Sequence, residues 1–398
     1  MKSIASRPSS YGWVVVLCAF TLMFVGFGAA YSFAAFFRAF QTEFAASRAH
    51  VSLVFSLCAF LYFLLGAPGG MLADRYGTRR VALVGVAFLV AGLVAASFAR
   101  SIEVLYATYS IGLGIGIGLT YVPSVGAVQP WFEKRRVLAS GVAVSGIGAG
   151  NLLAPPLAAW WIETLGWRGA YLALAACALV LGGAAAAAIR NRPAGHGRAA
   201  DGVPLRAALG SRDFWVLYVT LVLSGFGCFV PLVHIGPYAV DAGHPESLAV
   251  LLVSLIGLGS LIGRFAIGGV AHRLGTMASL ALMYLGMALM LLLWWASTGE
   301  GALSIMATGF GIFYGGFVAT FPSAVMERFG ARSVAGIIGC LYTAAGIGTL
   351  FGPPLAGAAY DAYGSYGAPI LGAALLAFLA AAGVYALPRG RQSPAAVA

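Results

Sequence analysis

The sequence predicts an all-α membrane protein in which twelve transmembrane helices form two six-helix bundles, with both termini in the cytoplasm. Three observations support this prediction: the composition, the spacing of the apolar stretches and an internal repeat. Of the 398 residues, 61% are hydrophobic and only 9% are charged, which is far outside the range of soluble globular proteins. A lipid bilayer is the solvent that such a composition fits.

Apolar stretches separate the clusters of charged residues, and each is long enough to cross a hydrocarbon core of about 30 Å as a helix. Runs this long and continuously apolar exclude a β-barrel, whose strands are short and alternate. The twelve expected spans are Tyr11–Phe37, His50–Leu72, Val81–Phe98, Val104–Pro130, Val137–Ile162, Trp167–Ile189, Phe214–Ala239, Ser247–Val270, Met277–Ser297, Ala302–Met326, Val334–Tyr360 and Tyr366–Leu387.

The first span follows a short basic tail, but it is too long for the core of a signal peptide and eleven further spans follow it. We therefore expect a retained helix. All five cysteines fall singly inside spans, without the spacing of metal ligands. They are expected to be small apolar packing residues, and neither a disulfide nor a metal site is expected.

The orientation follows from the basic residues between the spans. With the N-terminus inside, the cytoplasmic segments hold 18 of the 23 Lys and Arg residues and the outer segments hold 4. Cytoplasmic loops of membrane proteins carry this excess of positive charge. The net charge of +11 is thus a topology signal, and no basic segment has the aromatic interleaving of a nucleic-acid site.

The chain contains an internal repeat. Gly70, Asp74, Arg75 and Gly77 recur 198 residues later as Gly268, His272, Arg273 and Gly275, and the segment 148–158 recurs at the same offset as 346–356. Two separate motifs at one spacing indicate duplication of a six-helix unit. The predicted organisation is an N-terminal bundle (1–190), a flexible cytoplasmic linker rich in Gly and Pro (191–213) and a C-terminal bundle (214–398).

The loop after the second span reads Gly-Met-Leu-Ala-Asp-Arg-Tyr-Gly-Thr-Arg-Arg (70–80). It resembles the signature loop of the major facilitator superfamily, in which this loop latches the two bundles together on the cytoplasmic side. The resemblance implies a latch made by Asp74, Arg75, Arg79 and Arg80, with the carboxylate against a helix N-terminus. A loop that only sets the topology is the alternative interpretation.

A narrower resemblance is found in residues 131–146, Trp-Phe-Glu-Lys-Arg-Arg-Val-Leu-Ala-Ser-Gly-Val-Ala-Val-Ser-Gly. This stretch is similar to the entry of the fifth helix in monocarboxylate porters, and the segment 11–15 is similar to the end of their first-helix motif, without its acidic residue. The resemblance places the chain near these porters and the related oxalate–formate exchangers. It implies a secondary transporter rather than an enzyme, with no cofactor.

Two ionisable residues fall deep inside spans, and such residues are default candidates for function. Arg264, in the eighth span, has no acidic neighbour in sequence, so its guanidinium is available to hold a carboxylate with two hydrogen bonds. The resemblance implies the same role, because related porters carry a substrate-binding arginine at this place. The alternative is that Arg264 extends to the cytoplasmic interface.

His234, in the seventh span, lies between two prolines that loosen the helix. It is a candidate to contact the substrate and the candidate for proton coupling, because imidazole titrates near physiological pH; a hydrogen-bonded packing residue is the alternative. Polar groups near the middles of other spans are further candidates to contact a substrate. They are Tyr121 and Tyr314, and, with weaker support, Tyr31, Asn151 and Tyr342.

The number of positive charges expected in the binding site favours a cargo with a single negative charge. Oxalate exchangers carry a lysine in the eleventh helix where this chain has Ala345, so a monoanion fits better than a dianion. We expect a monomeric transporter of a small monocarboxylate such as lactate or pyruvate in the cell inner membrane, in contact with lipid and not with nucleic acid. Proton symport is left open, because the first-helix lysine of the animal porters is absent. The alternatives are an oxalate/formate-like exchanger and a proton-coupled drug exporter of the same fold.

Overall fold

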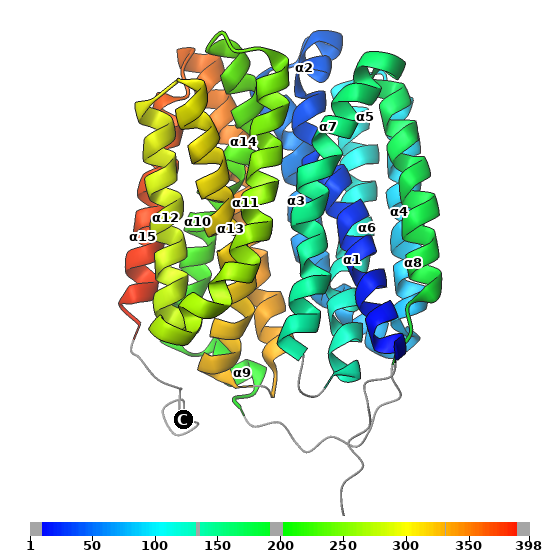
Figure 1. The fold of residues 1–398 in the computed structure, drawn as a ribbon, viewed down its shortest axis with the longest axis vertical. Coiled ribbons are helices and arrows are strands. Elements are labelled where there is room, and N and C mark those ends of the chain that lie inside the picture. Colours follow the sequence, from blue (N-terminus) through cyan, green and yellow to red (C-terminus); the bar gives the residue numbers. More distant parts are fainter. Residues whose placement is uncertain (1–9, 133–135, 192–201, 331, 388–398) are drawn as a thin grey trace, which may run out of the picture.

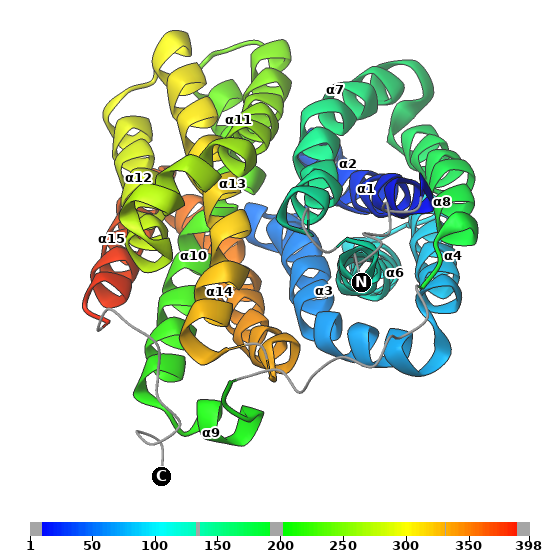
Figure 2. The ribbon, with the colours of Figure 1, turned by 60° about the horizontal axis from the view of Figure 1, so that its bottom comes forward.

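The computed structural model describes residues 10–132, 136–191, 202–330 and 332–387, and every long element within them is a helix. The first half of the chain forms one bundle, the N bundle (Figures 1 and 2). Its elements are α1 (Ser10–Tyr31), α2 (Phe33–Phe44), α3 (Arg48–Tyr76), α4 (Thr78–Ser97), α5 (Ile102–Leu105), a π-helical turn (Tyr106–Ser110), α6 (Ile111–Val128), a 3-10 turn (Gln129–Trp131), α7 (Arg136–Cys177), a second π-helical turn (Ala178–Gly182) and α8 (Gly183–Ala188).

The second half forms the C bundle, which lies beside the first in Figure 2. Ser211 begins its first long helix by accepting a hydrogen bond from the backbone N–H of Phe214, as a helix-capping serine does. The elements of the C bundle are α9 (Leu205–Leu209), α10 (Arg212–Asp241), α11 (Glu246–Leu274), α12 (Thr276–Ala296), α13 (Glu300–Phe329), α14 (Val334–Tyr363) and α15 (Gly367–Tyr385).

Eleven helical stretches of the described residues are long and apolar enough to cross a membrane. The prediction of an all-helical membrane protein is confirmed, although several helices run beyond the predicted spans; the first, for example, continues to Phe44 instead of Phe37. One stretch, Leu138–Ala188, has 51 residues and covers all but one end residue of each of the fifth and sixth predicted spans. Its helical path breaks at Gly166, which has φ 70° and ψ 166°.

The backbone repeats with the offset found in the sequence. Positive φ angles occur at Ala45 and Gly243, at Gly77 and Gly275, and at Gly166 and Gly364, and each pair is 198 residues apart. Gly77 and Gly275 have nearly the same conformation, and their N–H groups bond the carbonyls of Ala73 and Ala271, which keep this spacing. Gly364 ends α14, so its partner Gly166 marks the corresponding end inside the 51-residue stretch.

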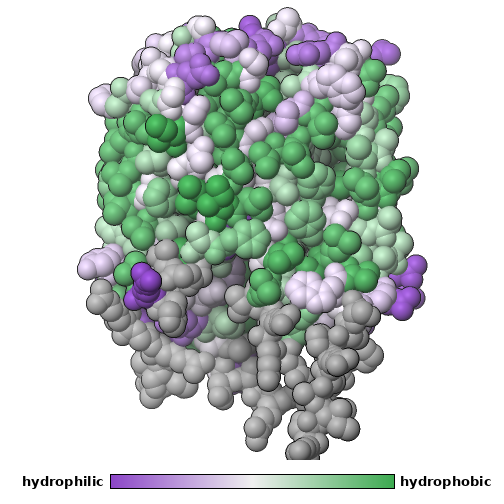
Figure 3. Space-filling model, viewed as in Figure 1, coloured by the Kyte–Doolittle hydropathy of each residue, from purple (hydrophilic) through white to green (hydrophobic). Residues whose placement is uncertain are grey.

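One end of the molecule, here called the linker face, holds α9, the start of α1 and the end of α15, at the bottom of Figure 1. The other end, the opposite face, holds the turn between α2 and α3. Tyr11 donates a hydrogen bond to the carbonyl of Ala188, and Trp167 contacts Glu43 near the end of α2. The 51-residue stretch therefore begins and ends at the linker face and turns at the opposite face. Figure 3 shows a hydrophobic middle zone between this turn region and the linker face.

The two bundles meet along two pairs of helices, α3 with α14 and α7 with α11. At the second contact the backbones approach closely at Gly257 of α11. A Cβ atom there would lie 2.4 Å from the backbone nitrogen of Leu152 and 2.6 Å from the carbonyl carbon of Asn151. Only glycine fits without a shift of the helices, as in other tightly packed membrane helices.

This contact predicts an effect on stability. Gly257→Ala should lower the free energy of unfolding by about 1–3 kcal/mol, because the new methyl group meets backbone atoms that cannot rotate away. Thermal unfolding of the purified protein measures the change. Gly372→Ala on α15 is the matched control, because nothing lies within 4 Å of a Cβ atom there. Equal melting temperatures for the two variants would contradict the packing described.

Candidate binding cavity

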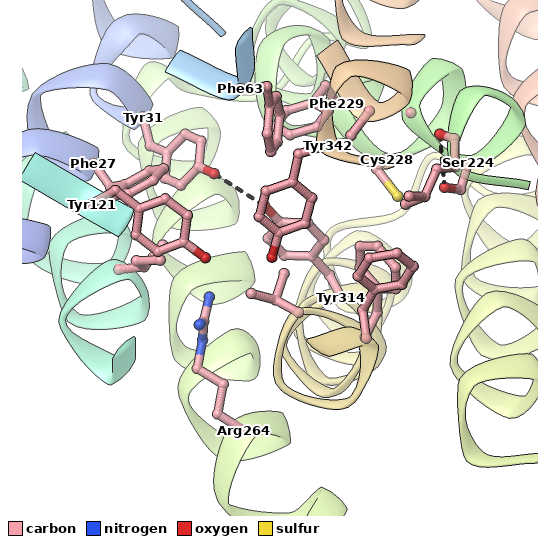
Figure 4. A pocket seen from close by; sticks show the side chains of 17 residues that line it. Phe27, Tyr31, Phe63, Tyr121, Ser224, Cys228, Phe229, Arg264, Tyr314 and Tyr342 are labelled. Atoms are coloured by element: carbon pink, nitrogen blue, oxygen red, sulfur yellow. Dashed lines mark hydrogen bonds between the residues drawn. The ribbon is translucent and has the colours of Figure 1, made fainter. Parts of the chain in front are cut away.

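A cavity of about 50 Å³ lies between the two bundles, and both contribute to its wall. Figure 4 shows its lining side chains. The wall is largely aromatic and aliphatic, and Arg264 is the only charged residue among the described residues that line it. The lining residues are Phe27, Tyr31, Phe63, Tyr121, Ile147, Leu221, Ser224, Gly225, Cys228, Phe229, Arg264, Tyr314, Phe317, Val318, Phe321, Tyr342 and Ala345.

Arg264 is 7% exposed and is only partly hydrogen-bonded. Its Nε donates to Ser260 Oγ at 3.4 Å and its Nη1 donates to the carbonyl of Val144 at 3.3 Å. Nη2 has no hydrogen-bond partner among the described residues, and no carboxylate of this part of the chain pairs with the guanidinium. A buried charge without a counter-charge costs several kcal/mol, so this group is prepared to take an anion.

The direction of Arg264 is set by close packing of α11 on α13. A Cβ atom at Gly263 would lie 2.0 Å from the carbonyl oxygen of Ile312, so the two backbones touch there. With Gly263 against α13, the adjacent Arg264 lines the cavity, and Ser260, one helical turn earlier, accepts the hydrogen bond from its Nε. In Figure 4 the guanidinium points into the cavity from below.

Four tyrosines surround the end of Arg264, two from each bundle. The hydroxyl groups of Tyr121 and Tyr342 point toward the guanidinium (Figure 4). Tyr31 of α1 and Tyr314 of α13 form a hydrogen bond of 3.0 Å between their hydroxyl groups, across the two bundles. Hydroxyl groups donate to and accept from a polar ligand, while the rings close the site to water.

The size and the chemistry of the cavity restrict its ligand. One buried water needs about 10–15 Å³ of such space, so 50 Å³ has room for a group of only a few heavy atoms beside the side chains. One cation and five hydroxyls, four from tyrosines and one from Ser224, in an otherwise apolar wall suit an anion with a single charge and a short apolar body. Among the lining residues described, none is acidic, so a cationic ligand has no counter-charge.

Five of the seven predicted contact residues line this cavity: Arg264, Tyr121, Tyr314, Tyr31 and Tyr342. His234 and Asn151 do not. His234 is fully buried nearer the opposite face, where its nitrogens lie within 3.0 Å of Tyr366 Oη and 2.8 Å of the carbonyl of Pro353. Asn151 is 1% exposed in α7, beside the close contact with Gly257, and both atoms of its amide lack partners among the residues described.

Most of the apolar wall could not be predicted from the sequence. Phe27, Phe63, Cys228 and Phe229 line the cavity, but phenylalanines and single cysteines occur throughout the spans. The four predicted latch residues lie at the turn between α3 and α4, exposed on the linker face. No hydrogen bond or ion pair joins Asp74, Arg75, Arg79 or Arg80 to another described residue; Arg75 lies over the ring of Tyr76 at 5.3 Å.

Comparisons with known proteins agree on one family. The model of the Major Facilitator Superfamily matches residues 15–337. Monocarboxylate transporter 11 of Mus musculus is 30% identical over 93% of this chain and 86% of its own length. Monocarboxylate transporter 3 of Rattus norvegicus is 30% identical over 89% of this chain and 75% of its own length.

The comparison with solved structures agrees on the fold. The crystal structure of a bacterial homologue of the human lysosomal transporter Spinster, in an inward-facing and unoccupied conformation, superposes with a TM-score of 0.73. It is 17% identical, and the match covers 97% of this chain and 99% of that one. At this identity the likeness concerns the fold alone.

The charge of the cavity predicts a reactivity pattern at Cys228. Compared with a free thiol in solution, this thiol should react with the anion iodoacetate about tenfold faster relative to neutral iodoacetamide of the same size, because Arg264 attracts the anion at an effective dielectric constant of about 20. Mass spectrometry measures the modification, and the fully buried Cys58 outside the cavity should stay unmodified. A preference that persists unchanged in Arg264→Gln would contradict this electrostatic account.

Proposed function

The chain belongs to the major facilitator superfamily and to its monocarboxylate-transporter branch, and on this premise we propose that it carries a small organic monocarboxylate, such as lactate or pyruvate, by alternating access. The observation that carries the proposal is the incompletely bonded guanidinium of Arg264 in a cavity without a carboxylate among its described lining. The carboxylate of the cargo would provide the missing counter-charge. Tyr121 and Tyr342 would donate hydrogen bonds to it.

We also propose the topology and the location of this transporter. The 51-residue stretch Leu138–Ala188 crosses the membrane twice, which gives twelve crossings and places both termini on one side. The excess of Lys and Arg at the linker face supports a cytoplasmic linker face. In a bacterial cell this corresponds to the inner membrane. The bundles 1–190 and 214–398 are the two units that move against each other.

The conformation has its bundles joined by polar contacts at the opposite face, so we interpret it as an inward-facing state. Arg38 pairs with Glu246, and Arg48 pairs with Asp241, across the two bundles at this face. The proposed latch residues are exposed at the linker face, as an inward-facing state requires. Asp74, Arg75, Arg79 and Arg80 are expected to bond the C bundle only when the linker face closes.

The alternative cargoes are less well supported by the cavity. Ala345 lies in its wall, at the place where the resemblance to oxalate exchangers implies a lysine, so a dianion such as oxalate would keep one uncompensated charge. A proton-coupled drug exporter needs an acidic group near its cargo, and the described lining has none. We propose His234 as the proton-coupling residue, acting from outside the cavity.

The first test concerns Arg264. In proteoliposomes, Arg264→Gln should reduce uptake of labelled lactate by at least about tenfold, because the transition between faces requires the anion to be neutralised, and Arg264→Lys should retain part of the activity. Arg100→Gln is the matched control, an exposed arginine on the opposite face that lies outside the cavity. Wild-type uptake by folded Arg264→Gln would remove Arg264 from the site.

The second test adds a charge. Ala345→Lys should raise uptake of a dicarboxylate such as oxalate or malonate about tenfold relative to lactate, because two cations then face two carboxylates. Ala345→Gln, which adds a chain of similar size without charge, separates charge from volume. If Ala345→Lys and Ala345→Gln had the same ratio of dicarboxylate to lactate uptake, the proposal that the single charge of Arg264 selects a monoanion would be contradicted.

A further inference from the structure

At the opposite face, Arg48 of α3 joins the N bundle to several residues of the C bundle. Its Nη1 lies 2.6 Å from Asp241 Oδ2 and its Nη2 donates to Asp241 Oδ1 at 2.9 Å, which is a two-point pair. The centre of the guanidinium lies 3.8 Å from the centre of the Tyr360 ring. The side chain of Arg48 is only 11% exposed, so water weakens these contacts little.

The same end of α3 holds a second carboxylate of the C bundle. The backbone N–H groups of Arg48 and Ala49 donate to Asp361 Oδ1 and Oδ2 at 3.1 and 3.0 Å. These are unpaired donors at the positive end of a long helix, where a carboxylate is favourable. Gly357 allows the approach, because a Cβ atom there would lie 2.7 Å from the nitrogen of Ala49.

A chain of hydrogen bonds leads from Arg48 to His234. Arg48 Nη1 donates to Tyr366 Oη at 2.7 Å, and Tyr366 Oη lies 3.0 Å from His234 Nδ1. His234 Nε2 lies 2.8 Å from the carbonyl oxygen of Pro353, which only accepts, so Nε2 carries the proton. Nδ1 is then the acceptor for the Tyr366 hydroxyl, and the imidazole is neutral in this arrangement.

The contact between α7 and α11, which the internal repeat relates to the contact between α3 and α14, lacks the Arg48–Asp241 ion pair and its hydrogen bonds. At the offset of 198 residues, Glu246 corresponds to Arg48 and Glu163 corresponds to Asp361. The edge formed by α7 and α11 therefore carries two acids where the edge formed by α3 and α14 carries an arginine and an acid. Glu246 instead pairs with Arg38, and both of these side chains are more than half exposed, at 73% and 56%. Such an exposed ion pair adds little to the stability of the contact between the bundles. The contact that closes the opposite face most tightly is therefore the one between α3 and α14.

We infer that Arg48, Asp241, Asp361, Tyr366 and His234 form a proton-sensitive gate that closes the cavity on the opposite face. The inference rests on the alternating-access function proposed above. Arg48 belongs to the N bundle and the other four residues to the C bundle, so opening of this face removes Arg48 from them.

The sign of the effect follows from the hydrogen bonds. In the closed gate a protonated His234 would direct a second cationic donor at Tyr366 Oη, which already accepts from Arg48. In the open gate that oxygen is free to accept from the imidazolium. Protons therefore bind the open gate better, and by reciprocity low pH at this face favours opening.

The groups around His234 are few. The charged and titratable ones are Arg48 from α3, Asp361 from α14, Tyr366 before α15, and Tyr238 and Asp241 on its own helix; Ser52 of α3 lies 3.2 Å from Nε2, and the ring of Phe37 of α2 packs against the imidazole. Among these, the imidazole is the group that ordinarily titrates between about pH 5 and pH 8.

The test measures the distance between the bundles without any cargo. Spin labels at Thr42 in α2 and Thr298 before α13, both exposed at the opposite face, report opening in lipid nanodiscs by electron–electron double resonance, with the native cysteines replaced. Lowering the pH from about 8 to about 5, the range in which imidazole titrates, should shift the wild-type distribution to longer distances. Arg48→Gln should give long distances at both pH values.

Tyr366→Phe is the decisive variant, because it keeps the ring and the Arg48–Asp241 pair and removes the hydroxyl that links Arg48 to His234. It should stay closed at high pH and lose the shift at low pH. Tyr238→Phe is the matched control, since its ring packs 6.0 Å from that of Tyr366 and its hydroxyl takes no part in the chain from Arg48 to His234. His50→Gln, at an exposed histidine of the same face, is the second control, and both should respond as the wild type does.

The inference would be overturned if the distance distribution of the wild type did not change with pH. It would also be overturned if the distribution of Tyr366→Phe shifted as that of the wild type does. An Arg48→Gln variant that stays closed at high pH would overturn it as well. None of these results depends on the cargo, so they leave the assignment of Arg264 to a carboxylate unaffected. Loss of uptake in Arg264→Gln with a normal pH response would support the cargo site and the gate independently.

Discussion

The guanidinium of Arg264 is the group on which the rest of the structure depends. It is a charge held 7% exposed between two bundles, with two weak hydrogen bonds to protein and one nitrogen without a partner among the residues described. Such a group is tolerated in a membrane span only where it faces protein or water and has a use. The close contact of Gly263 with α13, the tyrosines and the apolar wall all serve to direct this one charge at a small volume.

The two halves of the chain share a backbone and have diverged in charge. Three pairs of positive-φ residues keep the offset of 198, which indicates that the turns of the ancestral unit persist. The side chains that act do not repeat: at that offset Gly66 corresponds to Arg264, and Phe36 corresponds to His234. The two similar halves thus carry two different functional groups. Arg264 in the central cavity serves binding, and the contacts of Arg48 at the opposite face serve closure.

The sequence predicted the central site better than the gate. Arg264 stood out because a charge is rare within an apolar span, and the mid-span tyrosines because their hydroxyls need partners. Phe63 and Phe229 could not be distinguished from other lipid-facing or packing phenylalanines. Arg48, Asp241 and Asp361 lie one or two residues outside the predicted spans, where charges are ordinary, and their importance depends on which helix ends meet. For the same reason His234 was expected beside the cargo, whereas the fold places it outside the lining of the cavity. The ends of the helices also differ from the ends of the predicted spans, because the helices continue beyond the apolar stretches that cross the hydrocarbon core.

The central claim is that a carboxylate completes the bonding of Arg264. Calorimetric titration of the purified protein with lactate and with lactamide tests it most directly, since the two molecules have nearly the same shape and differ in charge. The account predicts heat of binding for lactate and none for lactamide at the same concentration, and no lactate binding to Arg264→Gln. Equal binding of lactate and lactamide by the wild type would contradict it.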